Sequence, residues 1–293
     1  YYSMFGFQRV GDQIWAAADL RCRGFLLGGT AGRTTLNGEG LQHEDGHSHL
    51  LASTVPNLMA YDPTYAYETA AIVLDGIRRM YTEQEDVLYY ITVHNENYAM
   101  PAMPEGAFDG IVKGLYKLNY VDAGQGGPKV HLFGSGSILR EVLRGQQILA
   151  EKYGISSQVW SATSYKCLAR DCEDVQRWNL LHPGETPRQS YLEQVLAAEG
   201  PADLVVSSSD NVRAVASMIA QHVPMDYYVL GTDGFGRSET RENLRRFFEV
   251  DAEHVVLATL HRLAKQGKID SQIPVRAVSE LGINPDLPNP VTR

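Results

Sequence analysis

Histidine and acidic side chains are concentrated between residues 42 and 49, where the sequence reads QHEDGHSH. The segment contains the pattern H-E-x-x-H, formed by His43, Glu44 and His47. On a helix, two histidines at this spacing lie on one face and can bind Zn²⁺, while the glutamate acts as a general base. Glu68, on a predicted helix further along the chain, could supply a third ligand. The pattern therefore raises the hypothesis of a zinc peptidase.

Glycines around this segment argue against such a helix. Gly46 lies inside the turn that the two histidines would share, and Gly38 and Gly40 precede it. A glycine within a helix costs about 1 kcal/mol relative to alanine. Two non-helical interpretations then remain, a solvated histidine-rich loop and an ordered active-site loop. We favour the ordered loop, which would present an imidazole for acid–base or charge-stabilising work near neutral pH.

Three further glycine-rich segments each follow a predicted strand, and in the second of them the backbone amides could hold an anion. They read GGTAGRTT at 28–35, GSGS at 134–137 and GTDGFGRS at 231–238. None has the spacing of a P-loop or of a dinucleotide-binding loop, so we interpret the first two as tight turns. In the third, Asp233 and Arg237 could be functional, but a salt-bridged turn or a subunit contact is the simpler interpretation.

The elements that would position these residues alternate between strands and helices. Apolar or β-branched runs predict strands near 24–29, 87–93, 129–134, 158–162, 204–207 and 227–231. Helical spacing predicts helices near 10–22, 137–153, 211–221, 241–248 and 253–266, and another from Asp62, as its cap, to about residue 81. This alternation indicates an α/β fold whose mostly parallel sheet is covered by helices on both faces.

The segment MPAMPEG at 100–106 breaks both patterns, so we place a domain boundary between residues 103 and 104. The strand at 87–93 ends at a polar run that begins with His94. Carboxyl ends of strands are where open α/β sheets bind ligands. We therefore expect a first unit at 1–103 and a second α/β unit at 104–293.

Composition narrows the classes of function. The 293 residues carry 26 basic and 35 acidic side chains, a net charge of -9, with no basic block of the kind that binds nucleic acid. Apolar runs are far shorter than the ~20 residues of a membrane helix, so we expect neither nucleic acid nor membrane as a partner. Three cysteines do not make a disulfide framework, which favours a cytoplasmic location. Because the chain begins at Tyr1 on an aromatic run, we expect a fragment of a longer protein.

Four long strings carry a resemblance to a known family. They are YYSMFGFQR at 1–9, TTLNGEGLQHEDGHSH at 34–49, NENYAMPAMPEG at 95–106 and GTDGFGRS at 231–238. Together they closely resemble the homodimeric-type pyruvate dehydrogenase, the thiamine diphosphate-dependent component of the bacterial pyruvate dehydrogenase complex. The resemblance implies a transketolase-type fold, with the last part of a pyrimidine-binding domain up to residue 103 and a complete C-terminal domain after it.

The resemblance also implies roles for three residues. Phe5 would stack on the aminopyrimidine of thiamine diphosphate, Tyr2 would direct its hydroxyl at the pyruvate-derived carboxylate, and His43 would lie beside the reacting adduct. The enzyme would be a homodimer that transfers the acetyl group to a lipoyl group of the acyltransferase component.

Two features of the family are not found in this sequence. One is the G-D-G motif, followed by an asparagine, that holds the cofactor's diphosphate through Mg²⁺. The other is the glutamate that activates the aminopyrimidine, which lies upstream of the matching segment. We therefore expect thiamine diphosphate and Mg²⁺ to be held largely by other parts of the parent protein, and this chain alone to be inactive. A catalytically silent dimerisation or interaction module remains the alternative.

Overall fold

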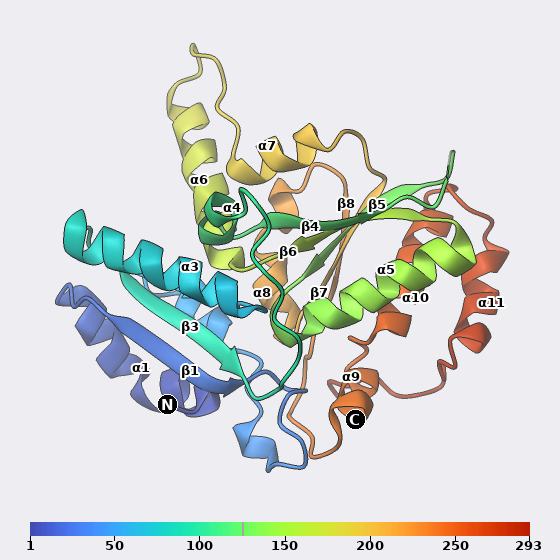
Figure 1. Ribbon diagram of the computed structural model, residues 1–293, viewed down its shortest axis with the longest axis horizontal. Helices are drawn as coiled ribbons and strands as arrows, with labels where there is room; N and C mark the ends of the chain where they lie inside the picture. The colour runs from blue at the N-terminus through green and yellow to red at the C-terminus, as the bar shows by residue number, and fades with distance from the viewer. Residues whose placement is uncertain (125) are drawn as a thin grey trace.

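Two β-sheets, formed by successive parts of the chain, organise the computed structural model (Figure 1), which describes residues 1–124 and 126–293. The first sheet is fully parallel, in the order β1-β3-β2. Its strands are β1 (Phe25–Ala31), β2 (Leu58–Tyr61) and β3 (Leu88–His94). The first five residues of β3 are buried, as expected of a central strand covered on both faces.

Helices cover both faces of this first sheet. They are α1 (Ser3–Asp19), α2 (Ser48–Ser53) and α3 (Ala66–Ile77), and α3 continues as a π-helical turn over Arg78–Thr82. Alternate residues of β3 point to opposite faces. Tyr90 therefore packs with Phe7 and Ile14 of α1, while Ile91 packs with Ile72 of α3. Figure 1 shows α1 and α3 on opposite sides of the sheet.

The second sheet has the order β4-β6-β5-β7-β8 and is parallel except for β4, which runs antiparallel to β6. Its strands are β4 (Tyr116–Val121), β5 (Lys129–Gly134), β6 (Ser156–Ser161), β7 (Leu204–Ser208) and β8 (Asp226–Leu230). Its helices are α4 (Phe108–Lys113), α5 (Leu139–Tyr153), α6 (Tyr165–Leu181), α7 (Tyr191–Ala198), α8 (Arg213–Ser217), α9 (Arg241–Phe247), α10 (Ala252–Lys265) and α11 (Gln272–Glu280). Short 3-10 turns lie at Leu41–His43, Gly136–Ile138 and Ala220–His222.

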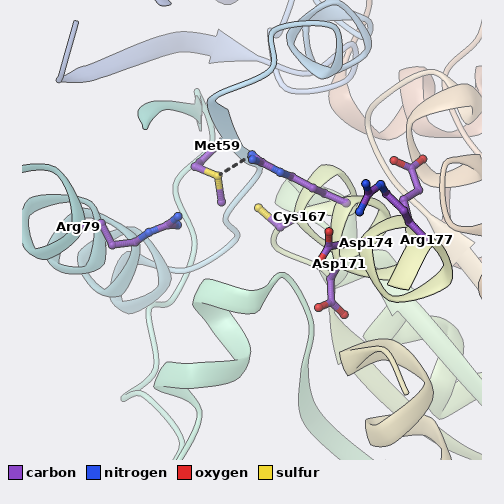
Figure 2. A pocket seen from close by; sticks show the side chains of 8 residues that line it. Met59, Arg79, Cys167, Asp171, Asp174 and Arg177 are labelled. Carbon is purple, nitrogen blue, oxygen red and sulfur yellow. Dashed lines mark hydrogen bonds between the residues drawn. The ribbon is translucent and has the colours of Figure 1, made fainter. Parts of the chain in front are cut away.

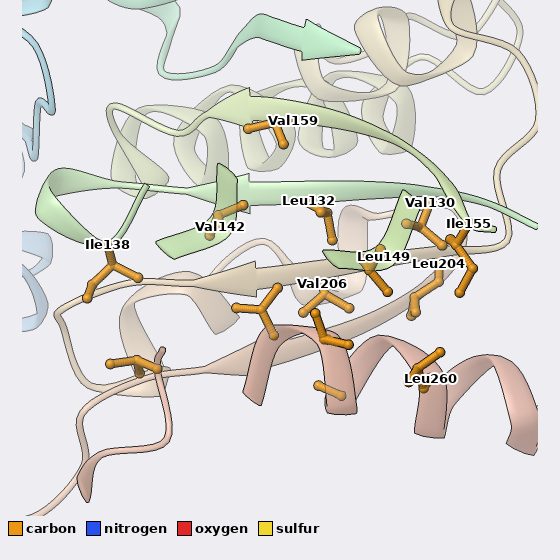
Figure 3. Close-up of a cluster of buried hydrophobic side chains, with 14 of the residues drawn as sticks. Val130, Leu132, Ile138, Val142, Leu149, Ile155, Val159, Leu204, Val206 and Leu260 are labelled. Atoms are coloured by element: carbon orange, nitrogen blue, oxygen red, sulfur yellow. The ribbon is translucent and has the colours of Figure 1, made fainter. Parts of the chain in front are cut away.

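The core of the second unit lies on the two faces of this sheet. On one face, Leu132 and Val206 of the strands pack against α5 and α10, as Figure 3 shows with Val142 and Leu260. On the other face, Phe133 and its neighbours pack against α6, α7 and α8. The α/β fold with a mostly parallel sheet, predicted from the alternation of elements, is therefore confirmed.

Several elements differ from the sequence-based expectations. Strands β2 and β4 and helices α2, α4, α6, α7 and α11 were not predicted, and the helix expected at 211–221 is only the short α8 followed by a 3-10 turn. Helix α1 begins at Ser3 rather than near residue 10, because Phe7 of the aromatic run packs edge-on against Tyr90, with ring centroids 5.0 Å apart. No helix of the described residues is long and apolar enough to cross a membrane.

Candidate active site

Tyr2, Phe5 and His43 lie against one another and form what we call the aromatic cluster. The Tyr2 and His43 rings stack with centroids 5.1 Å apart and an interplanar angle of 27°. The Phe5 and His43 rings meet edge to face at 5.3 Å, and the Tyr2 and Phe5 centroids are 6.0 Å apart. The structure thus brings together all three residues that the sequence analysis singled out.

The start of α1 is fixed at the carboxyl end of β1, which holds Tyr2 and Phe5 in place. The backbone carbonyl of Tyr1 accepts a hydrogen bond from Gly29 N–H at 2.8 Å, and Tyr2 pairs with Gly29 as a parallel bridge. The Tyr2 carbonyl then accepts the Phe5 N–H at 3.0 Å, which starts the helix. The cluster therefore lies where α/β sheets present ligand-binding groups.

His43 ends a 3-10 turn rather than lying on an α-helix, and this corrects the zinc-peptidase hypothesis. The turn covers Leu41–His43, and α2 begins only at Ser48, after His47. The two histidines therefore do not share a helical turn. Glu68 is fully buried and accepts hydrogen bonds from Tyr116 and Ser161, both at 2.6 Å. Within the described ranges, no group of three or more His, Cys, Asp or Glu side chains could hold a metal ion.

The two residues that follow His43 are buried and anchor its loop. Glu44 accepts the N–H of Arg237 on Oε2 at 2.7 Å, and its Oε1 has no hydrogen-bond partner in the part of the chain that the structure describes. Burial raises the pKa of Glu44 to about 8. Asp45 accepts the N–H groups of His47 and Ser48, both at 3.0 Å, in the turn that leads into α2. On the other side, His43 Nδ1 lies 3.2 Å from Glu39 Oε2.

The loop at 231–239 lies along the His43 loop. Gly38 N–H donates to the Glu239 carbonyl at 3.1 Å. A Cβ at Gly236 would come within 2.6 Å of the Leu41 carbonyl oxygen, so the close approach of the two backbones requires glycine there. Asp233 pairs with Arg213 of α8 at 2.5 Å and not with Arg237 of its own segment.

A buried polar network centred on Asp62 joins the first unit to the second beneath the site. Asp62 accepts hydrogen bonds from Thr92 (2.7 Å), His94 (2.9 Å), Asn211 (3.0 Å) and Ser135 (3.1 Å). Burial alone would raise the pKa of Asp62, but His94 and these hydrogen bonds lower it well below its usual range. The same carboxylate raises the pKa of His94 against the effect of burial. The sequence analysis missed this role and took Asp62 for a helix cap.

A separate pocket of about 630 Å³ (Figure 2) is lined by residues of β2, of the π-helical turn after α3 and of α6, and by none of the aromatic cluster. Its lining includes Met59, Arg79, Cys167, Asp171, Asp174 and Arg177. The Arg79 guanidinium pairs with Glu85 at 2.7 Å, and burial raises the pKa of the Cys167 thiol, which disfavours the nucleophilic thiolate. Cys167 is therefore poorly suited to act as a nucleophile in this pocket.

The chain is similar to known proteins over both of its parts. A model of the pyruvate dehydrogenase E1 component middle domain matches residues 1–101, and a model of the transketolase-like C-terminal domain matches residues 114–251. The chain is 58% identical over 292 residues to the pyruvate dehydrogenase E1 component of Escherichia coli, covering 99% of this chain and 32% of that relative. The matched portion is the C-terminal part of the relative.

Solved structures show the same fold at low sequence identity. The transketolase of Leishmania mexicana superposes with a TM-score of 0.64 at 17% identity, covering 91% of this chain and 34% of that one. A split-gene transketolase, described as an inactive tetramer, superposes with a TM-score of 0.59 at 16% identity, covering 90% of this chain and 75% of that one. The resemblance to the C-terminal part of pyruvate dehydrogenase E1 components, with a transketolase-type fold, is confirmed.

Proposed function

We propose that this chain, a relative of the pyruvate dehydrogenase E1 components, supplies one wall of an active site that decarboxylates pyruvate with thiamine diphosphate. The acetyl group is then transferred to a lipoyl group of the acyltransferase component. Residues 1–103 form the last part of the pyrimidine-binding domain and residues 104–293 the C-terminal domain of a cytoplasmic homodimer. The observation that carries the proposal is the aromatic cluster at the carboxyl end of β1.

The cluster fits the aromatic part of the cofactor. Aromatic rings stack offset or edge to face at centroid distances of 4.5–7 Å, and Phe5 is only partly buried. The Arg9 guanidinium lies 4.1 Å from the Phe5 centroid over one face, so the aminopyrimidine would use the other. Thiamine diphosphate supplies the electron sink that permits loss of CO₂. We place the Mg²⁺ and diphosphate site outside these residues, because the G-D-G motif and its following asparagine are not part of this sequence.

His43 and Tyr2 have distinct tasks in this proposal. Glu39 engages His43 at Nδ1, which holds one ring tautomer and leaves Nε2 to exchange a proton with the reacting oxygen. The Tyr2 hydroxyl donates to the carboxylate of the substrate. Both side chains are placed before the reaction starts, because they stack on each other and sit on anchored backbone, and such preorganisation lowers the cost of stabilising developing charge.

The test is His43→Ala in the full-length enzyme. We expect kcat to fall more than thiamine diphosphate binding weakens, because the imidazole acts on the reacting group and not on the resting cofactor. His261→Ala is the matched control, since His261 is exposed on α10. Turnover measured as CO₂ release that is unchanged by His43→Ala would refute the role of His43.

The silent dimerisation module remains a second candidate, favoured by one finding. The split-gene transketolase chain that shares this fold is described as an inactive tetramer. We expect residues 1–293 alone to show neither steady decarboxylation nor tight cofactor binding. Calorimetric titration with thiamine diphosphate and Mg²⁺, on this chain and on the full-length enzyme, separates the two candidates. If the full-length enzyme also fails to bind the cofactor, the silent module is the better description.

A further inference from the structure

The aromatic cluster joins two segments that are far apart in the chain. Tyr2 and Phe5 lie at the start of α1, whereas His43 lies in the loop before α2. Contacts between rings do not by themselves fix one backbone relative to another, because each side chain can turn about its own single bonds. The position of the loop relative to α1 must therefore be set by other groups.

A buried carboxylate, that of Asp45, connects the two segments. Asp45 is 3% exposed and lies two residues after His43. Its Oδ2 accepts a hydrogen bond from the hydroxyl of Ser3, the first residue of α1. Its Oδ1 accepts the backbone N–H groups of His47 and Ser48, both at 3.0 Å. One oxygen of the carboxylate therefore holds α1, and the other holds the loop that carries His43.

The connection is completed against the first sheet. The Ser3 hydroxyl lies 3.0 Å from the hydroxyl of Tyr90 on β3. The backbone of Asp45 forms an antiparallel bridge with Gly32, which follows β1. Ser3 and Tyr90 are fully buried. All of these groups belong to this chain and are buried within it, so the connection is made by these residues alone.

We propose that Asp45 and Ser3 are positioning residues, which hold the three rings of the aromatic cluster together. The inference rests on the proposed function, in which His43 and Tyr2 act on the same reacting group. Both oxygens of Asp45 face groups of this chain, so Asp45 acts on the reaction only through the loop and the helix that it connects. The Ser48 hydroxyl also donates to the Ser3 carbonyl at 3.1 Å, but this second contact lies further from His43 along the chain.

The most selective way to break the connection is Ser3→Ala. This substitution removes the hydroxyl and leaves the two N–H groups bound to Asp45, so the turn before α2 should stay folded. Asp45→Ala is less selective. Burial lowers the pKa of Arg33 and the charge of Asp45 opposes that shift, so removing the carboxylate also removes a charge that favours the buried guanidinium.

The first readout is the position of the rings in the full-length enzyme without cofactor. para-Fluorophenylalanine in place of Phe5 gives one fluorine NMR signal, whose shift depends on the His43 ring that meets it edge to face. His43→Ala supplies the reference shift without that contact, and for Ser3→Ala we expect the signal to move towards this reference. Ser190→Ala is the matched control and should leave the signal unchanged. Ser190 is 2% exposed and likewise donates to a carboxylate, that of Glu193, but on α7.

The second readout is the release of CO₂ from pyruvate by the unlabelled full-length enzyme. A misplacement of about 1 Å can lower a rate about 100-fold, so for Ser3→Ala we expect kcat to fall roughly 10- to 100-fold. The urea midpoints of Ser3→Ala and Ser190→Ala should be similar, because each loses one buried hydrogen bond to a carboxylate. Where Asp45→Ala folds, adding Ser3→Ala to it should lower kcat no further, because both substitutions break the same connection.

Three results would overturn the positioning role. One is a fluorine signal that Ser3→Ala leaves in place, which would mean that other contacts hold the cluster. Another is a displaced signal with unchanged kcat, and the third is an equal loss of kcat in Ser3→Ala and Ser190→Ala. If the unmodified enzyme releases no CO₂ from pyruvate, the proposed function fails, and the fluorine signal alone then decides whether Asp45 and Ser3 hold the cluster.

Discussion

The buried carboxyl of Glu44 should make the stability of this chain depend on pH. Its side chain is 1% exposed, and burial raises its pKa from an ordinary value of 4.5 to about 8. Glu44→Gln keeps an acceptor for the Arg237 N–H, which Glu44 Oε2 now accepts at 2.7 Å, but cannot ionise. The difference in unfolding free energy between the wild-type chain and Glu44→Gln therefore isolates the titration of this one group.

The direction of this pH dependence follows from the number of protons that Glu44 binds in the folded and in the unfolded state. Below pH 4.5, Glu44 is protonated in both states. Between 4.5 and about 8 the folded state holds one proton more than the unfolded state, so the unfolding free energy falls as pH rises. The slope is about 1.4 kcal/mol per pH unit, so the difference should shrink by about 2 kcal/mol between pH 6 and pH 7.5. Above pH 8 the difference should level off.

Urea denaturation followed by circular dichroism, at half-unit steps from pH 5.5 to pH 9, measures this difference. Glu185→Gln is the matched control, because Glu185 is exposed in the turn after α6 and its substitution should not change the pH profile. A difference between wild type and Glu44→Gln that is constant with pH would refute the reasoning. It would show that Glu44 is ionised at neutral pH despite its burial.

Three further predictions concern packing and charge. Asp62→Asn leaves His94 without its 2.9 Å charge partner and should lower the unfolding free energy by about 3–5 kcal/mol. A loss near zero in urea denaturation would show that the buried pair does not depend on the charge of Asp62. Leu132→Ala removes a fully buried side chain and should cost about 2–5 kcal/mol in the same assay, and less than about 1 kcal/mol would contradict the packing of β5. Gly236→Ala places a methyl group 2.6 Å from the Leu41 carbonyl, so it should lower turnover of the full-length enzyme while reducing the unfolding free energy by only about 1–3 kcal/mol. Normal turnover would contradict the need for the two loop backbones to approach closely.

The sequence allowed correct predictions for elements whose structure is determined by their own residues. The buried strands β3, β5 and β7 are built around short runs of apolar residues, as parallel strands covered on both faces require. The loop around His43 was correctly predicted as non-helical from Gly46. The structure adds the reason for that glycine, because a Cβ there would come within 2.2 Å of the Arg33 side chain.

Other elements have sequence patterns that are too short or too polar to predict them. Strand β2 has four residues, and β4 is an edge strand whose exposure alternates only in part. Helix α6 was missed because many of its positions are polar, with Leu168 and Cys172 among the few that are buried. The Asp62 network was out of reach for a different reason. Its partner Asn211 lies 149 residues away along the chain, and a local sequence pattern cannot indicate a contact between residues so far apart.

The position of the Asp62 network also determines what a cut in the chain would do. The segment joining the two units is exposed at 99–103, whereas Asp62 and its partners Ser135 and Asn211 are buried across the junction. A protease that cleaves this connection would produce two fragments that stay associated under native conditions. They would separate only when this carboxylate is returned to water and the other contacts between the units, such as the hydrogen bond from Ser164 to the Ala60 carbonyl, are broken. The units are therefore held in register by buried contacts and not by the peptide bond between them.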